Sequence, residues 1–123
     1  MKKLFLLLLL ISCSGKENVN SLTPGDFDAK LKNTPNAILL DVRTEEELKE
    51  GMLEGAQNIV YDKAFDQKLG GLLKETPIFI YCAKGKRSSQ AAEILKEKGF
   101  REVYQLKGGI VAWREANMPV EAK

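Results

Sequence analysis

Short apolar runs alternate with helical patterns along most of this chain, and this alternation limits its fold more than any other feature. A chain in which strands and helices alternate folds as an α/β protein with a mainly parallel sheet. The apolar runs predict strands at 37–42, 58–60, 78–81 and 103–106, with a short edge strand at 19–22. Helices are predicted at 23–31, 44–50, 64–69, 88–98 and 110–116. Such sheets bind ligands beyond the carboxyl ends of their strands, where we expect the functional residues.

Cys82 directly follows the apolar run 78–81, and a basic loop containing Gly85 separates it from the next helix. Three cations lie within five residues of it: Lys84, Lys86 and Arg87. A glycine allows the backbone to curl so that successive N–H groups converge, and a helix N-terminus favours anions. A thiolate is an anion. The loop therefore predicts a cysteine whose pKa is lowered from its usual value of about 8.5.

The chain contains no histidine, which excludes whole classes of chemistry. Cys–His and Ser–His–Asp catalysis are ruled out, as is a histidine-ligated metal site, and we expect neither a metal nor a cofactor. The local field must activate Cys82 on its own. The alternative is a structural cysteine ending a core strand, but the three cations that follow it argue against a dry core.

The first dozen residues form a pattern of their own. Lys2 and Lys3 precede an unbroken apolar run at 4–11, far shorter than the roughly 20 residues that span a bilayer. This pattern predicts a signal peptide at 1–12. The run ends in Leu10-Ile11-Ser12-Cys13, which resembles the lipobox of bacterial lipoproteins, with an ordinary secretory signal as the alternative.

The lipobox resemblance implies that Cys13 carries a lipid and becomes the first mature residue. We therefore expect an exported protein of the cell envelope or periplasm, anchored to a bacterial membrane by its lipid. The polar segment at 13–20 is the predicted tether, and residues 21–121 form one domain.

The charge balance is neutral once the signal is removed. Loss of Lys2 and Lys3 reduces the 19 basic side chains to 17, equal to the 17 acidic ones, so we expect no nucleic-acid partner. With Cys13 lipidated, Cys82 is the single free thiol, because the chain has two cysteines. It has no disulfide partner and no resolving cysteine, which argues against a thioredoxin-like mechanism. We expect a monomer.

Four segments, in this order and spacing, resemble the signatures of the rhodanese family of single-domain sulfurtransferases. The resemblance covers about residues 18–121. The segments are Leu40-Asp41-Val42-Arg43 with Glu46-Glu47-Leu48, 51–59, 82–88, and Gly108-Gly109-Ile110-Val111-Ala112-Trp113 followed by Met118-Pro119-Val120. The resemblance implies a rhodanese-like three-layer α/β/α sandwich with a mainly parallel five-stranded sheet.

By this resemblance, Cys82 takes a sulfane sulfur from an anionic donor such as thiosulfate, becomes a persulfide, and passes the sulfur to a thiol or to cyanide. The substrate-binding residues that it implies are Ala83, Lys84, Gly85, Lys86, Arg87 and Ser88. Their backbone N–H groups would stabilise the persulfide anion. Arg87 would grip sulfonate oxygens in a fork, and the lysines would act as point charges, although exposed lysines also serve solubility.

Four further residues are expected to support the site: Asp41, Arg43, Gly108 and Gly109. The first two would end a strand and fix the following loop by ion pairs and hydrogen bonds. The glycine pair would let the backbone approach the active-site loop, or simply form a turn before a helix. Met52 stands where the family commonly has histidine, and we expect a modest effect on pKa tuning or packing.

Three other functions compete with sulfur transfer. Cysteine phosphatases and arsenate reductases place five residues between cysteine and arginine, whereas four separate Cys82 from Arg87, a tighter ring that suits one added sulfur better than a phosphoryl group. A non-catalytic binding module would use the loop only as an anion or partner surface. A redox sensor would oxidise Cys82 to a sulfenate and depend on another protein for reversal.

Overall fold

Five parallel strands form the centre of the computed structural model, which describes residues 19–122. The strands are β1 (Asn20–Leu22), β2 (Ile38–Asp41), β3 (Gln57–Asn58), β4 (Ile78–Tyr81) and β5 (Val103–Leu106). Their order in the sheet is β1-β5-β4-β2-β3, and every neighbouring pair is parallel. The predicted parallel sheet is confirmed. The predicted signal peptide, Cys13 and most of the predicted tether lie outside the described residues.

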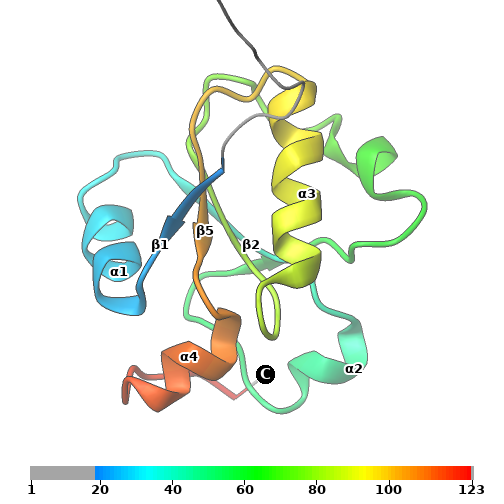
Figure 1. The fold of residues 1–123 in the computed structure, drawn as a ribbon. Helices are drawn as coiled ribbons and strands as arrows, with labels where there is room; N and C mark the ends of the chain where they lie inside the picture. Colours follow the sequence, from blue (N-terminus) through cyan, green and yellow to red (C-terminus); the bar gives the residue numbers. More distant parts are fainter. Residues whose placement is uncertain (1–18, 123) are drawn as a thin grey trace, which may run out of the picture.

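Helices cover both faces of the sheet and give the predicted three layers (Figure 1). The elements are α1 (Pro24–Lys32), α2 (Glu45–Leu48), the 3-10 helix η1 (Phe65–Leu69), α3 (Lys86–Glu97) and α4 (Gly109–Glu115). One face packs against α3 and η1, and the other against α1 and α4. Figure 1 shows α2, α4 and the loop that enters α3 at one end of the molecule, where β2, β4 and β5 finish. That end carries the candidate site.

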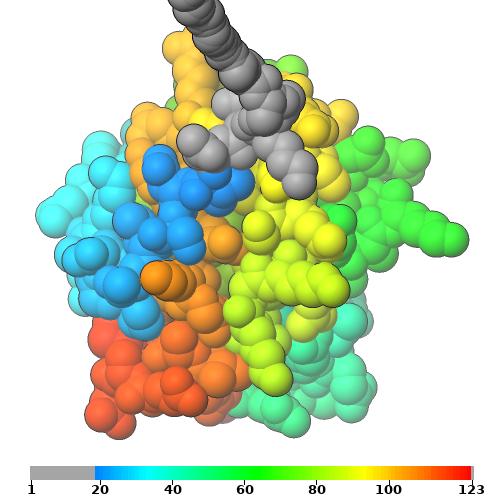
Figure 2. Space-filling view, viewed as in Figure 1, coloured from blue at the N-terminus to red at the C-terminus, as the bar shows by residue number. Residues whose placement is uncertain are grey.

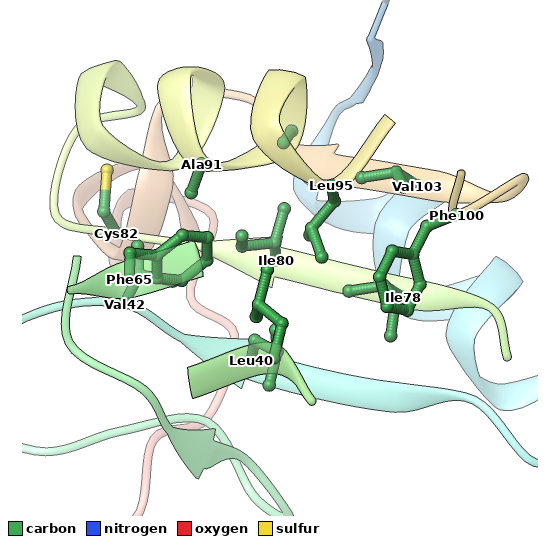
Figure 3. Packing of buried hydrophobic residues seen from close by; sticks show 12 residues of the cluster. Leu40, Val42, Phe65, Ile78, Ile80, Cys82, Ala91, Leu95, Phe100 and Val103 are labelled. Atoms are coloured by element: carbon green, nitrogen blue, oxygen red, sulfur yellow. The ribbon is translucent and has the colours of Figure 1, made fainter. Parts of the chain in front are cut away.

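The central strand β4 is buried along its whole length, and its side chains alternate between the two faces. Phe79 and Tyr81 pack with Phe27 of α1 on one side, whereas Ile80 packs beneath α3 on the other. Cys82, the residue after the strand, continues this alternation onto the α3 side (Figure 3). The period of the strand therefore directs the cysteine toward the helix that follows it.

The spacing of Thr44 and Glu47 predicts a capping box at the start of α2, and the structure contains it. The Thr44 hydroxyl accepts a hydrogen bond from the Glu47 backbone N–H at 3.3 Å, and the Glu47 carboxylate accepts one from the Thr44 N–H at 3.0 Å. These bonds satisfy N–H groups that a helix start leaves free. They also hold the Glu47 side chain at the edge of the candidate site.

The structure differs from the sequence predictions at several element boundaries. Helix α3 begins at Lys86, two residues before the predicted start, because Gly85 at φ +111° forms its N-cap without a side-chain cap. The element at 65–69 is a 3-10 helix, β3 lies at 57–58, and β1 includes the last residue assigned to the tether. Across residues 19–122, no helix has the length and apolar character needed to cross a membrane.

Candidate active site

Backbone N–H groups surround the Cys82 sulfur, which points toward the first turn of α3 (Figure 3). The N–H groups of Gly85 and Ser88 donate to Sγ at 3.1 and 3.3 Å. The Ser88 hydroxyl oxygen lies 3.4 Å from the same sulfur. The positive φ of Gly85 turns the chain so that these donors converge, a conformation that a residue with a Cβ rarely adopts. The loop is therefore shaped around one atom.

Two opposing effects set the pKa of the Cys82 thiol. Burial is the largest effect and acts against ionisation, because a buried charge loses its hydration. The hydrogen bond with the Ser88 hydroxyl and those from the N–H groups of Ser88, Gly85 and Lys84 act in the other direction. Together they prevail, and the pKa of Cys82 is lowered from its usual value. The shift of the pKa toward the thiolate form requires no side-chain base.

Cys82 is only 1% exposed, and its inner side contacts the apolar cluster beneath α3. Its approach is a pocket of about 310 Å³ over the active-site loop, lined by Cys82, Ala83, Lys84, Lys86 and Arg87. In the space-filling view, this loop reaches the surface between the segments of α4 and α2 (Figure 2). The nucleophile is thus reached from the loop side.

Helix α4 holds the outer side of the same loop. The N–H groups of Ile110 and Val111 donate to the carbonyl oxygens of Cys82 and Ala83 at 2.9 and 3.1 Å. A Cβ on Gly109 would collide with the Ala83 carbonyl, so the glycine permits this close approach. Gly108, at φ +77°, is the N-cap of α4. Because the carbonyls of Cys82 and Ala83 point to α4, the N–H groups that follow are free to face the sulfur.

The three cations of the loop have different surroundings. Lys84 and Lys86 are exposed and form no ion pair with any residue between 19 and 122. The guanidinium of Arg87, which the sequence assigned to donor oxygens, instead binds both carboxylate oxygens of Glu47, at 2.7 and 2.9 Å. This ion pair joins the first turn of α3 to α2. The lysines remain available to an incoming anion.

The Arg87 hydrogen bonds lower the pKa of Glu47 to about 2. Burial acts against this shift, and hydrogen bonds from the Thr44 backbone and side chain support it. Glu47 is therefore a carboxylate at any physiological pH. It is occupied by Arg87 and Thr44 and does not serve as a general base.

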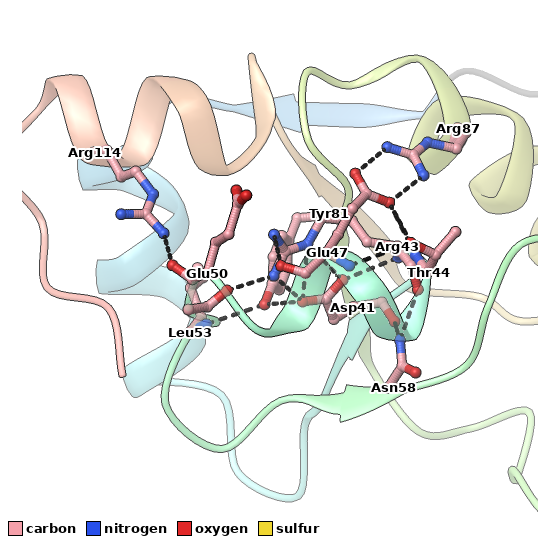
Figure 4. A network of polar contacts seen from close by, with 11 residues as sticks. Asp41, Arg43, Thr44, Glu47, Glu50, Leu53, Asn58, Tyr81, Arg87 and Arg114 are labelled. Atoms are coloured by element: carbon pink, nitrogen blue, oxygen red, sulfur yellow. Dashed lines mark hydrogen bonds and ion pairs between the residues drawn. The ribbon is translucent and has the colours of Figure 1, made fainter. Parts of the chain in front are cut away.

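A buried polar network lies next to the cysteine, at the carboxyl end of β2 (Figure 4). Arg43 donates through Nε and Nη2 to the Asp41 carboxylate at 3.0 and 2.8 Å, and through Nη2 to the Gly51 carbonyl at 2.7 Å. The Tyr81 hydroxyl donates to Asp41 Oδ2 at 2.5 Å and accepts from the Leu53 N–H at 3.0 Å. The network fixes the loops after β2 and α2.

Of the residues that the sequence singled out, the structure places eleven around this end of the sheet, and Cys13 is outside the described residues. The loop 82–88 encloses the sulfur, Asp41 and Arg43 form the neighbouring network, and Gly108 and Gly109 contact or cap the elements that hold the loop. Across residues 19–122, no group of three His, Cys, Asp or Glu residues is placed to hold a metal ion.

The sequence profile described as Rhodanese-like domain matches residues 23–116. This chain belongs to that family. It is 31% identical over 104 residues to a protein named Sulfurtransferase from Allochromatium vinosum, a match covering 85% of this chain and 96% of the relative. A tRNA uridine(34) hydroxylase from Chlamydia caviae is 37% identical over 102 residues, covering 77% of this chain but only 30% of that protein. A crystal structure of a rhodanese-related protein from Thermoplasma volcanium superimposes with a TM-score of 0.75 at 29% identity, covering 85% of this chain and 99% of the other.

Sequence reasoning missed three participants in this rhodanese-like site: Glu47, Tyr81 and Gln105. Glu47 stood in the first signature segment with no role at the site, and Tyr81 in an apolar strand. The Ser88 hydroxyl donates to Gln105 Oε1 at 2.5 Å, so Gln105 touches the group beside the sulfur. One signal was available: Gln105 is a polar residue inside an otherwise apolar strand.

Proposed function

We propose that this rhodanese-like protein is a sulfurtransferase that carries a sulfane sulfur on Cys82. The observation that supports it best is the set of N–H donors around Sγ, in a chain without histidine. Such donors stabilise a sulfur anion directly, so neither the thiolate nor the persulfide needs a proton acceptor. The relative named Sulfurtransferase, matched over nearly its whole length, adds support.

Both proposed half-reactions are displacements at sulfur. The Cys82 thiolate attacks the outer sulfur of thiosulfate, a new S–S bond forms, the bond to the sulfonate sulfur breaks, and sulfite leaves with the electron pair. The acceptor, a thiolate or cyanide, then attacks the outer sulfur of the persulfide. The electron pair of that S–S bond returns to Sγ, which again becomes a thiolate.

In this proposal the cations have two roles. Lys84 and Lys86, exposed beside the pocket over the sulfur, attract an anionic donor. Arg87 acts mainly through Glu47, by holding the first turn of α3 where the Ser88 N–H reaches the sulfur. The donor is thus drawn by exposed charge, and the sulfur is held by buried dipoles.

Mass measurement tests this function. Incubation with thiosulfate should add the mass of one sulfur atom to the wild-type protein, and cyanide should remove it with release of thiocyanate. Cys82→Ser should gain nothing. Hydrolysis of p-nitrophenyl phosphate in place of sulfur uptake would favour a phosphatase. If neither sulfur uptake nor hydrolysis is seen, the protein is a binding module and the proposal is wrong.

We also propose export and lipid anchoring through Cys13, which rest on the sequence pattern of residues 1–13. A diacylglyceryl group and a further acyl chain supply about 0.8 kcal/mol per buried CH₂, enough to anchor a small domain. The full chain expressed in a Gram-negative host should fractionate with membranes, and Cys13→Ala should not. Recovery of both forms in the soluble fraction contradicts the anchor.

A further inference from the structure

A second pocket, of about 400 Å³, lies beside the active-site loop. Its walls come from the α2 region and from α4, which flank the loop in Figure 2. Glu50, just beyond α2, lines one wall, Ile110, Val111 and Arg114 line the other, and Ala83 belongs to the loop itself. Val111 is 38% exposed, so part of the α4 wall is an apolar surface open to solvent. The volume suits a small organic molecule.

Ala83 connects this pocket with the reactive sulfur. It lines both the 400 Å³ pocket and the 310 Å³ pocket that contains Cys82. Neighbouring Cα atoms are about 3.8 Å apart, so the two pockets adjoin within the width of one residue. A molecule seated between α2 and α4 would therefore lie beside Ala83, the residue that follows Cys82.

Two of the charged residues that line this pocket are already engaged. Arg43 donates to Asp41, to the Gly51 carbonyl and to the Glu47 carbonyl, and the Glu47 carboxylate binds Arg87 and Thr44. Their charges are neutralised inside the protein. Neither offers a free charge to a ligand.

Glu50 and Arg114 are the two lining residues whose charges are not neutralised by ion pairs. No residue between 19 and 122 forms an ion pair or hydrogen bond with the Glu50 carboxylate. Arg114 donates through Nη2 to the backbone oxygen of Glu50, as Figure 4 shows, which places its guanidinium at the pocket and leaves its charge unpaired. The pocket thus presents one carboxylate and one guanidinium beside an apolar wall.

We propose that this pocket binds the sulfur acceptor, and that the acceptor is a small thiol bearing an amino-acid head group. Glu50 would bind its ammonium, Arg114 its carboxylate, and Ile110 with Val111 its methylene carbons. This inference rests on the proposed sulfurtransferase function and names its acceptor class. Cyanide has neither charged group, so it would gain nothing from this pocket.

The transfer step requires no further reactant. The acceptor thiolate attacks the outer sulfur of the Cys82 persulfide, the new bond makes a low-molecular-mass persulfide, and the old S–S bond breaks. Its electron pair remains on Sγ, where the N–H groups of Gly85 and Ser88 receive the restored thiolate.

Four thiols on the same short scaffold separate the two charges. Cysteine carries both the ammonium and the carboxylate, cysteamine only the ammonium, 3-mercaptopropionate only the carboxylate, and 2-mercaptoethanol neither. The protein is first loaded with sulfur, and loss of that sulfur is followed by mass in a single turnover. Because these thiols differ in their own pKa, each is compared with itself between wild type and variant.

Arg114→Gln should raise the half-saturating concentration of cysteine and of 3-mercaptopropionate about tenfold, the loss expected for one charge-assisted contact. The half-saturating concentration of cysteamine should change less than twofold. Glu50→Gln should give the opposite pattern: the half-saturating concentrations of cysteine and cysteamine should rise, and that of 3-mercaptopropionate should stay unchanged. The matched controls Arg101→Gln and Glu75→Gln alter exposed residues before β5 and β4, at the opposite end of the sheet, and should change no thiol.

Cyanide separates this inference from the function on which it rests. If thiosulfate loads no sulfur, or cyanide removes none, the sulfurtransferase proposal fails. If loading and cyanide turnover are normal but all four thiols respond alike to Arg114→Gln and Glu50→Gln, the acceptor pocket is wrong and the function stands. If Arg114→Gln also slows cyanide turnover, it is compared with Arg114→Lys, which keeps the positive charge. Arg114→Lys should bring the half-saturating concentration of 3-mercaptopropionate back toward the wild-type value.

Discussion

The neighbouring strands β2 and β4 end side by side, with Asp41 opposite Tyr81, but the groups at their ends are arranged in different ways. At the end of β2, Asp41 and Arg43 neutralise each other and are almost fully buried. At the end of β4, Cys82 is buried too, yet it faces N–H dipoles instead of a compensating ion. The Asp41–Arg43 pair therefore has its charges balanced within the protein. The N–H donors around Cys82 can instead stabilise a negative charge that is present only when the sulfur is ionised.

At this edge of the sheet, the end of β2 therefore has a structural role, and the end of β4 carries the reactive thiol. A buried ion pair with every hydrogen bond made is difficult to change and suits a fixed scaffold. Dipoles around a sulfur accept a thiolate or a persulfide without rearranging a counter-ion. Substitutions at the β2 end should therefore alter the free energy of unfolding, and substitutions around the β4 end should alter the pKa and reactivity of the Cys82 thiol.

Asp41→Asn should have the largest effect, on the free energy of unfolding. It leaves the Arg43 guanidinium, 3% exposed, without its counter-charge, and removes a carboxylate that also accepts from Tyr81. We expect a loss of about 3–5 kcal/mol in the free energy of unfolding, measured by urea denaturation. Asp28→Asn removes a partly exposed carboxylate from a surface pair with the exposed Lys32 and should cost less than about 0.5 kcal/mol. Equal effects in the two variants would refute the distinction.

Gly109→Ala should lower both the free energy of unfolding and the reactivity of the Cys82 thiol. The added methyl group meets the Ala83 carbonyl, and the backbone at φ +66° disfavours alanine, so we expect a loss of about 1–3 kcal/mol. Displacement of the loop should also turn its N–H groups away and slow alkylation of Cys82 by iodoacetamide. Gly71→Ala, where a Cβ meets nothing within 4 Å, is the control and should do neither. Unchanged alkylation in Gly109→Ala would show that α4 does not hold the loop.

Glu47→Gln tests the ion pair that joins α2 to α3. The Glu47 pKa is about 2 in the folded protein and about 4.5 in the unfolded chain, so its carboxylate stabilises the fold above about pH 5. That contribution is lost as the pH falls toward 2. Since a third of the side chain is exposed, solvent screening reduces it to about 1–2 kcal/mol. The stability gap between wild type and Glu47→Gln should narrow on acidification, and a constant gap from pH 7 to pH 3 would argue against this assignment.

Gln105→Glu should have the smallest effect and the most local one. When Cys82 ionises, the Ser88 hydroxyl can donate to the sulfur only if Gln105 turns its amide N–H toward Ser88. A carboxylate only accepts, so it retains the Ser88 proton and adds a negative charge nearby. The alkylation rate of Cys82 should then rise at a higher pH than in wild type and be several-fold lower near neutrality. Gln90→Glu makes the same change on the exposed face of α3 and should leave the profile unshifted.

The features predicted well from the sequence were those written in a few consecutive residues. The Thr44 capping box, the buried run before Cys82 and the alternation of strands and helices depend on local pattern, and they led to the right fold. The start of α3 was predicted two residues late, at Ser88, because the helix follows a left-handed glycine, Gly85, and has no side-chain cap that would mark its start in the sequence.

The partners of Arg87 and Ser88 could not be predicted in the same way. Arg87 binds Glu47, 40 residues earlier, and Ser88 binds Gln105, 17 residues later. Such pairs depend on which strand ends the sheet brings together. Arg87 therefore looked like a free anion-binding fork, although a carboxylate of the same chain occupies it.

The near-complete burial of Cys82 has a consequence for the proposed sulfur transfer. An S–S bond is about 2.05 Å long, so an atom added to Sγ extends by that length into the pocket over the loop. If the proposed sulfur transfer is right, the unloaded protein shields its thiol from bulky oxidants, and loading brings the transferable sulfur outward, toward an acceptor thiol. On this proposal, solvent accessibility of the outer sulfur would distinguish the loaded protein from the unloaded one, and an acceptor would contact that sulfur before Cys82 itself.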